Sequence, residues 1–263
     1  MAVEPAAMLA VASKAARAAS DLLRGAQASS VRTKSNPRDL VTEWDLRSEQ
    51  TIREVLADTG LPVLGEEGGQ SEQSGAPYRW LVDPIDGTVN FAHGLPIWSI
   101  SIALEEVGQG VVCGVVAAPV IGWWFEAIRG GGARDASGNP LAVSKCTQLD
   151  QALLATGFPY DLPTNPNNNL REWEHFQRTA AACRRLGSAS LDLCLVGCGW
   201  FDGYWERRLS PWDIAAGALI VVEAGGRVTN TRGGAFDVHA GEALASNGAI
   251  HDGLVTELAR VRT

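Results

Sequence analysis

Two aspartates follow an apolar segment in Trp80-Leu-Val-Asp-Pro-Ile-Asp-Gly-Thr88, and they are the residues with the clearest chemical potential. Asp83 and Asp86 stand just before a glycine and a hydroxyl, and the segment contains no lysine or arginine. Carboxylates gathered without a cation repel one another and raise each other's pKa, so such a group normally binds a hard divalent cation. Taken alone, the segment favours an Asx-type turn, in which Asp and Gly merely end a strand and cap the next element.

The residues on either side favour convergence of the two acids. Tyr78–Val82 is rich in aromatic and β-branched residues and predicts a buried strand, which we expect to end at the acids because Pro84 has no N–H to donate. Asp83 is then expected at the carboxyl end of a strand, where open α/β sheets bind ligands. Gly87 permits a tight turn, so that both carboxylates can turn inward.

The same turn offers further groups. It leaves the Ile85 carbonyl free, which gives three oxygen ligands within four residues. If Gly87, Thr88 and Val89 open a helix, their free N–H groups form an anion site beside the cation. The segment therefore predicts a place for both a metal ion and a phosphate.

Two more acidic segments occur elsewhere in the chain. Val63-Leu-Gly-Glu-Glu67 is another apolar run that stops at acids, although a solvated loop explains it equally well. In Ser210-Pro-Trp-Asp-Ile-Ala-Ala-Gly217, Asp213 stands in the first turn of a predicted helix, where an acid commonly caps the helix or complements its dipole. These alternatives leave the three segments unrelated, whereas a shared metal site unites them.

The order of the three motifs resembles that of the inositol monophosphatase family. The motifs are G-E-E, D-P-I-D-G-T-V-N-F and W-D-I-A-A-G with E-A-G-G after it, and the likeness includes Lys34–Asp45 and Arg185–Leu195. It covers almost the whole chain. The resemblance implies one domain over residues 1–263 with an α/β (α+β) fold of stacked α, β, α, β and α layers, and a site between its two halves.

The resemblance also implies roles for individual residues. It places one Mg²⁺ on Glu66, Asp83 and the Ile85 carbonyl, a second on Asp83, Asp86 and Asp213, and a third, weaker ion near Glu66. It gives Thr88 the role of orienting the attacking water and Asp45 that of bonding to this threonine. The remaining implied roles are phosphate binding by Gly87 and Thr88, and leaving-group binding by Asp86, Asp213, Ser188, Ala189 and Glu206.

By this resemblance the chain is a Mg²⁺-dependent, lithium-sensitive phosphatase that binds two to three ions. A metal-activated water would attack the phosphorus in line with the leaving alkoxide of myo-inositol 1-phosphate or a similar small polyol phosphate. Fructose 1,6-bisphosphate, histidinol phosphate and 3′-phosphoadenosine 5′-phosphate are alternative substrates. Relatives that bind the transcription machinery suggest an alternative of another class, a protein-binding role. Family members are commonly dimers, so a homodimer is expected.

Composition limits the possible binding partners and the expected location of the protein. The 263 residues carry 22 basic and 30 acidic side chains, and a net charge of −8 disfavours nucleic acid held by charge alone. The five cysteines are dispersed without a C-x-x-C pair, which favours reduced thiols. Pro5–Ala28 reads as an amphipathic helix rather than a signal peptide, and no run approaches the ~20 apolar residues that cross a bilayer. We expect a cytoplasmic enzyme with no membrane segment.

Residues 1–140 are expected to form a mainly antiparallel-sheet half. After the first helix, the pattern predicts a second helix at Asp45–Asp58, followed by strands at Pro62–Gly65, Tyr78–Val82, Ile97–Glu105, Val111–Ala117 and Trp123–Ile128. Gln70–Pro77 and Gly130–Pro140 are expected to be loops, the second with a hairpin.

Residues 141–263 alternate predicted strands and helices, which favours an α/β half. The expected helices are Leu170–Cys183, Ala189–Cys198, Trp212–Ala224 and His251–Arg260, and the expected strands are 152–157, Phe201–Glu206, Arg227–Asn230 and Ala243–Ser246. Asp161–Asn169, with its prolines and asparagines, is expected to be a loop near the mouth of the site. Several tryptophans are expected in the core or an interface, with sugar stacking as the alternative: Trp123, Trp124, Trp173, Trp200 and Trp205.

Overall fold

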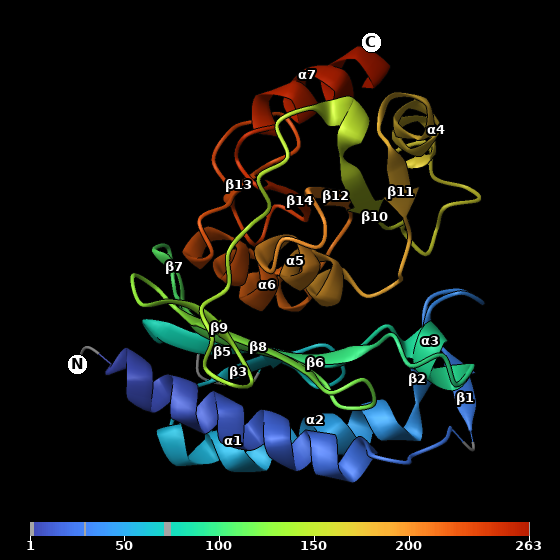
Figure 1. Ribbon diagram of the computed structural model, residues 1–263. Helices are drawn as coiled ribbons and strands as arrows, with labels where there is room; N and C mark the ends of the chain where they lie inside the picture. Colours follow the sequence, from blue (N-terminus) through green and yellow to red (C-terminus); the bar gives the residue numbers. More distant parts are fainter. Residues whose placement is uncertain (1–2, 29, 71–74, 263) are drawn as a thin grey trace.

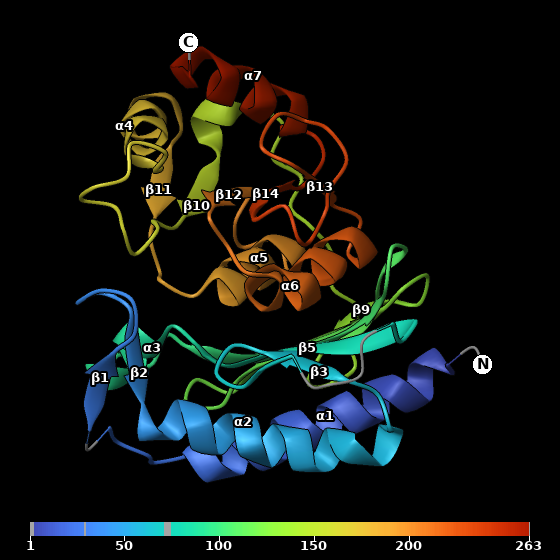
Figure 2. The same cartoon turned by 180° about the vertical axis from the view of Figure 1, so that it is seen from behind.

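The computed structural model describes residues 3–28, 30–70 and 75–262, and these stack as alternating layers of helices and sheets (Figure 1). Figure 2 shows α1 and α2 beneath the larger sheet, α5 and α6 between the two sheets, and α4 and α7 on the far side of the smaller sheet. This order is the α, β, α, β, α arrangement expected from the sequence. Among the described residues, no helix combines the length and apolar character needed to cross a membrane.

The N-terminal half is built on a seven-stranded sheet in the order β4-β3-β5-β6-β7-β8-β9. Its strands pair antiparallel except for β3 and β5, which are parallel. The elements are α1 (Pro5–Leu23), β1 (Val31–Thr33), β2 (Leu40–Thr42), α2 (Glu43–Leu56), β3 (Val63–Gly65), β4 (Gly69–Gln70), β5 (Tyr78–Asp86), α3 (Thr88–Ala92), β6 (Ser99–Glu106), β7 (Gly110–Ala118), β8 (Trp123–Ile128) and β9 (Gly132–Asp135).

The C-terminal half is built on a five-stranded sheet in the order β11-β10-β12-β14-β13. Strand β10 pairs parallel with β11 and β12, whereas β14 pairs antiparallel with β12 and β13. The elements are β10 (Leu153–Thr156), α4 (Leu170–Thr179), β11 (Ala182–Arg184), α5 (Ala189–Gly197), β12 (Gly203–Arg207), α6 (Pro211–Glu223), β13 (Arg227–Thr229), β14 (Glu242–Ser246) and α7 (His251–Arg262).

The central helices α5 and α6 are largely apolar because sheets cover both of their faces. Glycines allow them to approach their neighbours closely. A Cβ on Gly217 would lie 2.6 Å from the Leu193 side chain, and one on Gly114 would lie 2.9 Å from Ala216. This tight packing holds the first turns of α5 and α6 against the edge of the larger sheet, where the acids lie.

Several predicted boundaries are wrong. Strand β5 does not end at Val82 but continues through Pro84 to Asp86, because an irregular register between Asp83 and Asp86 accommodates the missing proline donor. The predicted helix Leu170–Cys183 ends at Thr179, and Ala182–Arg184 instead forms β11 beside β10. The first helix was predicted to reach Ala28, but it ends at Leu23, two residues before Gly25.

Other predictions have mixed outcomes. The predicted loop Gln70–Pro77 falls partly on residues 71–74, which lie outside the described residues. The hairpin of β1 and β2 has no counterpart in the predicted elements. Core packing is confirmed for Trp205, which is fully buried, whereas Trp200 is 57 % exposed and stacks edge-on against Trp123.

Candidate active site

The end of β5 and the turn into α3 hold the candidate residues Asp83, Asp86 and Gly87. Gly87 has φ 100° and precedes the first residue of α3, and a Cβ there would lie 3.0 Å from the Gly187 carbonyl oxygen. Only glycine fits both this conformation and this space. Asp83 Oδ1 accepts a hydrogen bond from the Ile85 amide at 3.0 Å, so the Asx-type turn is present as well.

Asp45 and Thr88 meet as the resemblance implied. The Thr88 hydroxyl lies 3.0 Å from Asp45 Oδ1 and 3.1 Å from the Ile85 carbonyl oxygen. Asp45 Oδ2 accepts from the amide and hydroxyl of Thr42 at 2.8 and 2.6 Å, which completes the capping box of α2. Burial raises the pKa of Asp45, and these hydrogen bonds oppose the increase. The start of α2 therefore fixes the side chain of Thr88.

Glu66 follows β3 and is paired with a lysine that the sequence analysis did not assign. Lys34 lies in the link between β1 and β2, and its Nζ lies 2.8 Å from Glu66 Oε1 and 2.5 Å from Glu67 Oε1. Burial raises the pKa of Glu66 to about 7, against the opposing effect of Lys34. The β1–β2 hairpin thus brings a cation to the acidic site.

Glu49 positions the turn that carries Glu66. Its carboxylate accepts from the Glu67 amide at 2.7 Å and the Gly68 amide at 2.8 Å, and Arg53 donates to it at 2.7 Å. A Cβ on Gly68 would lie 2.6 Å from this carboxylate, so a larger residue there would displace the Glu49 side chain. Sequence reasoning missed Glu49, although the glycines around Glu66 and Glu67 were a signal for close packing.

Asp86 joins the two halves of the molecule. Its carboxylate accepts from the hydroxyls of Ser188 and Ser190 at 2.8 and 2.6 Å and from the amides of Ala189 and Ser190 at 3.3 and 2.7 Å, all at the start of α5. Burial raises its pKa, and these donors oppose the increase. The Ala189 amide, which the resemblance assigned to the leaving group, is directed at Asp86 in this structure.

Asp213 also has the capping role that the sequence left open. It is the third residue of α6, and its Oδ2 accepts from the Ser210 amide at 2.7 Å. The pKa of Asp213 is nevertheless raised well above its usual range, by burial and then by the charges of Asp86 and Glu66. Asp213 therefore caps α6 and still interacts electrostatically with the other acids.

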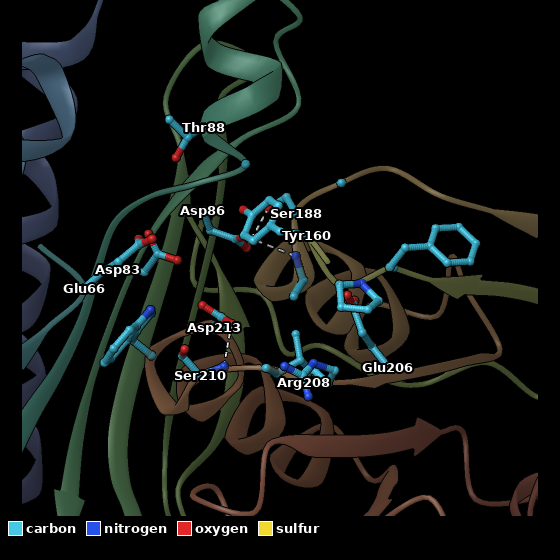
Figure 3. A pocket seen from close by; sticks show the side chains of 18 of the residues that line it. Glu66, Asp83, Asp86, Thr88, Tyr160, Ser188, Glu206, Arg208, Ser210 and Asp213 are labelled. Carbon is cyan, nitrogen blue, oxygen red and sulfur yellow. Dashed lines mark hydrogen bonds between the residues drawn. The ribbon is translucent and has the colours of Figure 1, made fainter. Parts of the chain in front are cut away.

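Four acids from three distant segments line one hollow of about 310 Å³ (Figure 3). They are Glu66, Asp83, Asp86 and Asp213, and Figure 3 shows their side chains around one open space between the two halves. Burial, followed by the charges of the other three acids, raises the pKa of Asp83 well above its usual range. The three motifs are thus brought together.

Oxygen donors of this kind suit Mg²⁺ in type and number. In the described part of the chain, however, no three His, Cys, Asp or Glu side chains stand close enough to hold an ion as they lie. Lys34 holds Glu66, the start of α5 holds Asp86, and Ser210 holds Asp213. The residues fit a divalent cation chemically, and binding requires their carboxylates to draw together.

The opposite side of the hollow carries Glu206, at the end of β12. Its carboxylate accepts from the Tyr204 hydroxyl at 2.6 Å, and burial raises its pKa to about 7. A Cβ on Gly157 would lie 2.1 Å from Glu206 Oε2, so glycine makes room for this side chain. Gly87, Thr88, Ser188 and Ala189 also line the hollow, which places all the predicted substrate contacts around it.

Sequence reasoning gave no role to several other residues of the hollow, among them Tyr160, Arg185, Asp192 and Arg208. Asp192 is buried in α5, and its Oδ1 has no hydrogen-bond partner among the described residues. Burial and the nearby charge of Glu206 raise its pKa well above the usual range. Neither Tyr160, in a loop, nor Arg208, directly after a strand, belongs to a motif that would have marked it.

The sequence and the overall fold both match known proteins. The sequence model of the inositol monophosphatase family matches residues 4–263. An inositol-1-monophosphatase of Caulobacter vibrioides is 39% identical over 229 residues, which cover 86% of this chain and 90% of that protein. The Nus factor SuhB of Pseudomonas aeruginosa is 41% identical over 260 residues, 95% of both. The structure of inositol monophosphatase from Anabaena (Nostoc) sp. PCC 7120 superposes with a TM-score of 0.88 at 37% identity, covering 97% and 96% of the two chains.

Proposed function

The chain belongs to the inositol monophosphatase family and is a phosphatase, and we propose that it hydrolyses myo-inositol 1-phosphate or a similar small polyol phosphate with Mg²⁺. The observation that carries the proposal is the convergence of Glu66, Asp83, Asp86 and Asp213 on one hollow. Lys34 offsets only part of their charge, and a divalent cation would offset the rest. We further propose that both halves act as one domain, since each contributes acids to the hollow.

The metal ligands we propose are Glu66, Asp83, the Ile85 carbonyl, Asp86 and Asp213, for two to three Mg²⁺ ions. When bound, Mg²⁺ supplies positive charge for the phosphoryl oxygens and lowers the pKa of water. The chain supplies the positioning. Thr88 donates its proton to Asp45, so its oxygen is left to accept a hydrogen bond from the attacking water. Glu66 takes the proton of that water as general base.

The remaining residues would bind the ester itself. The Gly87 and Thr88 amides lie where the chain enters α3 and would bind the phosphate. Glu206 has a carboxylate fixed by Tyr204, and together with Asp86, Asp213, Ser188 and Ala189 it would accept or donate hydrogen bonds to the polyol hydroxyls. The Ala189 contact requires Asp86 to release that amide.

Phosphate release by purified protein tests the proposal. We expect hydrolysis of myo-inositol 1-phosphate that requires Mg²⁺, stops with a chelator and is inhibited by Li⁺. The same assay with fructose 1,6-bisphosphate, histidinol phosphate and 3′-phosphoadenosine 5′-phosphate ranks the alternative substrates. Absence of Mg²⁺-dependent hydrolysis of every ester contradicts the assignment.

A protein-binding role is the second candidate, because one relative is named a Nus factor. Binding to purified bacterial RNA polymerase, measured with the native chain and with Asp213→Asn, separates the two functions. A binding role independent of hydrolysis predicts equal binding by both proteins. Binding by neither removes this candidate.

Two further properties belong to the proposal. We propose a homodimer, supported by the exposed apolar side chains of Val120 and Trp200, the latter stacked on Trp123 at 5.1 Å between ring centroids. Light scattering should give twice the chain mass of 27.9 kDa. We also propose a cytoplasmic location, which the five free thiols favour.

A further inference from the structure

Arg208 has an unusual backbone for its residue type. It follows β12 directly, two residues after Glu206, and its φ is 62°. It is the single non-glycine residue with positive φ in the chain as described. This conformation brings Cβ close to the following carbonyl oxygen, and strained residues of this kind cluster at functional sites.

Two hollows meet at Arg208. It lines the acidic hollow, and with Leu209 it also lines a second hollow of about 500 Å³. Three arginines, Arg207, Arg208 and Arg232, surround this second hollow. Its one acid, Glu242, accepts a hydrogen bond from Thr231. The lining therefore changes from acidic to basic on passing Arg208.

Anchoring of the neighbouring loop does not account for Arg208. Its Nη2 lies 3.1 Å from Asp161 Oδ2, but both side chains are partly exposed, at 47% and 36%. Such an ion pair contributes less than the left-handed backbone costs. The loop is already held by Arg207, which pairs with Glu172 and donates to Asn167 Oδ1 at 2.9 Å.

The guanidinium of Arg208 has capacity for another partner. Five N–H donors arranged as a fork match a phosphate or carboxylate group, and a single 3.1 Å contact with Asp161 leaves most of them available. Arg207 Nε is buried at the same hollow without a hydrogen-bond partner among the described residues. Arg232 is exposed at its rim.

We propose that Arg208 is a specificity-determining residue that binds a second anionic group on the leaving group of the substrate. The reacting phosphoryl group then lies among the acids of the first hollow, and the second anionic group extends past Leu209 toward Arg207 and Arg232. The substrate class is a polyol phosphate that carries a further phosphate or carboxylate, and a cationic leaving group is disfavoured. This inference rests on the proposed phosphatase function.

Paired substrates test the proposal. We compare kcat/KM for myo-inositol 1,4-bisphosphate and myo-inositol 1-phosphate at saturating Mg²⁺. The native protein should prefer the bisphosphate by about tenfold, the factor expected for one charge-assisted contact. Arg208→Gly should abolish this preference through KM, and it should fold because glycine suits φ 62°. Arg208→Lys should keep part of the preference, and Arg232→Ala should lose part of it.

Asp161→Asn separates anion binding from loop anchoring. If Arg208 binds the second anion, removal of the competing carboxylate raises the preference for the bisphosphate. If Arg208 only anchors the loop, Asp161→Asn and Arg208→Gly raise KM for both esters alike, and the proposal is overturned. Arg178→Ala is the control, since Arg178 is an exposed residue of α4 paired with Glu174.

The activity of the native protein shows whether the inference alone is wrong or the phosphatase proposal is wrong as well. Hydrolysis of the monophosphate with no preference for the bisphosphate, or with a preference that Arg208→Gly leaves intact, overturns the inference alone. Hydrolysis of neither ester overturns the phosphatase proposal and this inference together.

Discussion

Two acids with almost no exposed surface have opposite electrostatic surroundings in this molecule. Glu105, in β6, is 3% exposed and contacts Arg79 at 2.6 Å and His239 at 2.8 Å. Burial acts to raise its pKa, but these two partners outweigh burial and hold the pKa below its usual value. Asp83, in β5, is 2% exposed, and burial together with Glu66 raises its pKa well above the usual value.

The difference shows which buried charges stabilise the fold and which oppose it. In an ion pair such as that of Glu105 and Arg79, the two charges compensate each other. Removing one partner leaves the charge of the other uncompensated. The acids around Asp83 repel one another, and Lys34 offsets only part of this charge. Groups that oppose folding in this way are characteristic of functional sites, where a ligand supplies the missing charge.

The largest expected effect is that of Asp83→Asn. The amide keeps an acceptor for the Ile85 amide but removes one of the mutually repelling charges. We expect Mg²⁺-dependent phosphate release to fall by at least about 10³-fold, because loss of a metal ligand costs several kcal/mol of transition-state stabilisation. The melting temperature without Mg²⁺ should be unchanged or higher. Retained hydrolysis contradicts the proposed site, and a marked loss of stability contradicts the comparison.

Glu105→Gln should have the converse effect. It removes the charge that compensates Arg79, so the free energy of unfolding should fall by roughly 3 kcal/mol. Phosphate release by the folded variant should stay close to that of the native protein, since Glu105 does not line the acidic hollow. Urea unfolding and the phosphate assay measure the two quantities. If the variant is inactive yet fully stable, the comparison is wrong, because Glu105 then contributes to activity and not to stability.

His251 extends the comparison to a buried base outside the site. Burial and Arg227 lower its pKa to about 4, and the neutral ring lies 2.9 Å from the Thr229 hydroxyl and 2.8 Å from that of Ser246. As pH falls below about 6.5, the unfolded chain takes up a proton that the folded protein binds only near pH 4.

The free energy of unfolding should therefore decrease by roughly 2 kcal/mol between pH 6.5 and 4 on account of His251. Unfolding in urea across this range measures it. His251→Gln removes the titrating ring and should flatten the profile by that amount. An unchanged profile in the variant means that His251 does not titrate as described.

Gly157→Ala is expected to give the smallest effect. Its Cβ would displace the Glu206 carboxylate, whose oxygens lie 2.1 and 2.2 Å from that position. We expect KM to rise about tenfold, equivalent to the loss of one hydrogen bond, with little change in kcat. Gly253→Ala is a matched control, since a Cβ there meets nothing within 4 Å. A normal KM for Gly157→Ala removes Glu206 from the leaving-group site.

Much of the site could be read from short segments because their structure is local. The glycine at 87, directly after Asp86, predicted a turn into a helix, and Gly87 takes φ 100° before α3. Asp213 in the first turn of a helix was likewise a local pattern, and it caps α6. The layered fold followed from the family resemblance rather than from the pattern of apolar residues.

Local reasoning was wrong where neighbouring strands decided the outcome. A proline was expected to end β5 at Val82, but pairing with β6 continues around Pro84 through an irregular register. Residues Ala182–Arg184 were expected in a helix, yet they form β11 because β10 offers an open edge. Hydrogen bonds to a distant strand outweigh the preferences of a short segment.

The amino-acid sequence by itself determined which acids end which segments, because turn geometry and helix capping depend on a few adjacent residues. Only the tertiary structure decided that Asp86 meets the start of α5 and that Lys34 meets Glu66. It also decided that Glu105 pairs with Arg79, whereas Asp83 has no ion pair among the described residues. Compensation of a buried charge depends on groups from distant segments, and their spacing along the chain does not specify which of them meet.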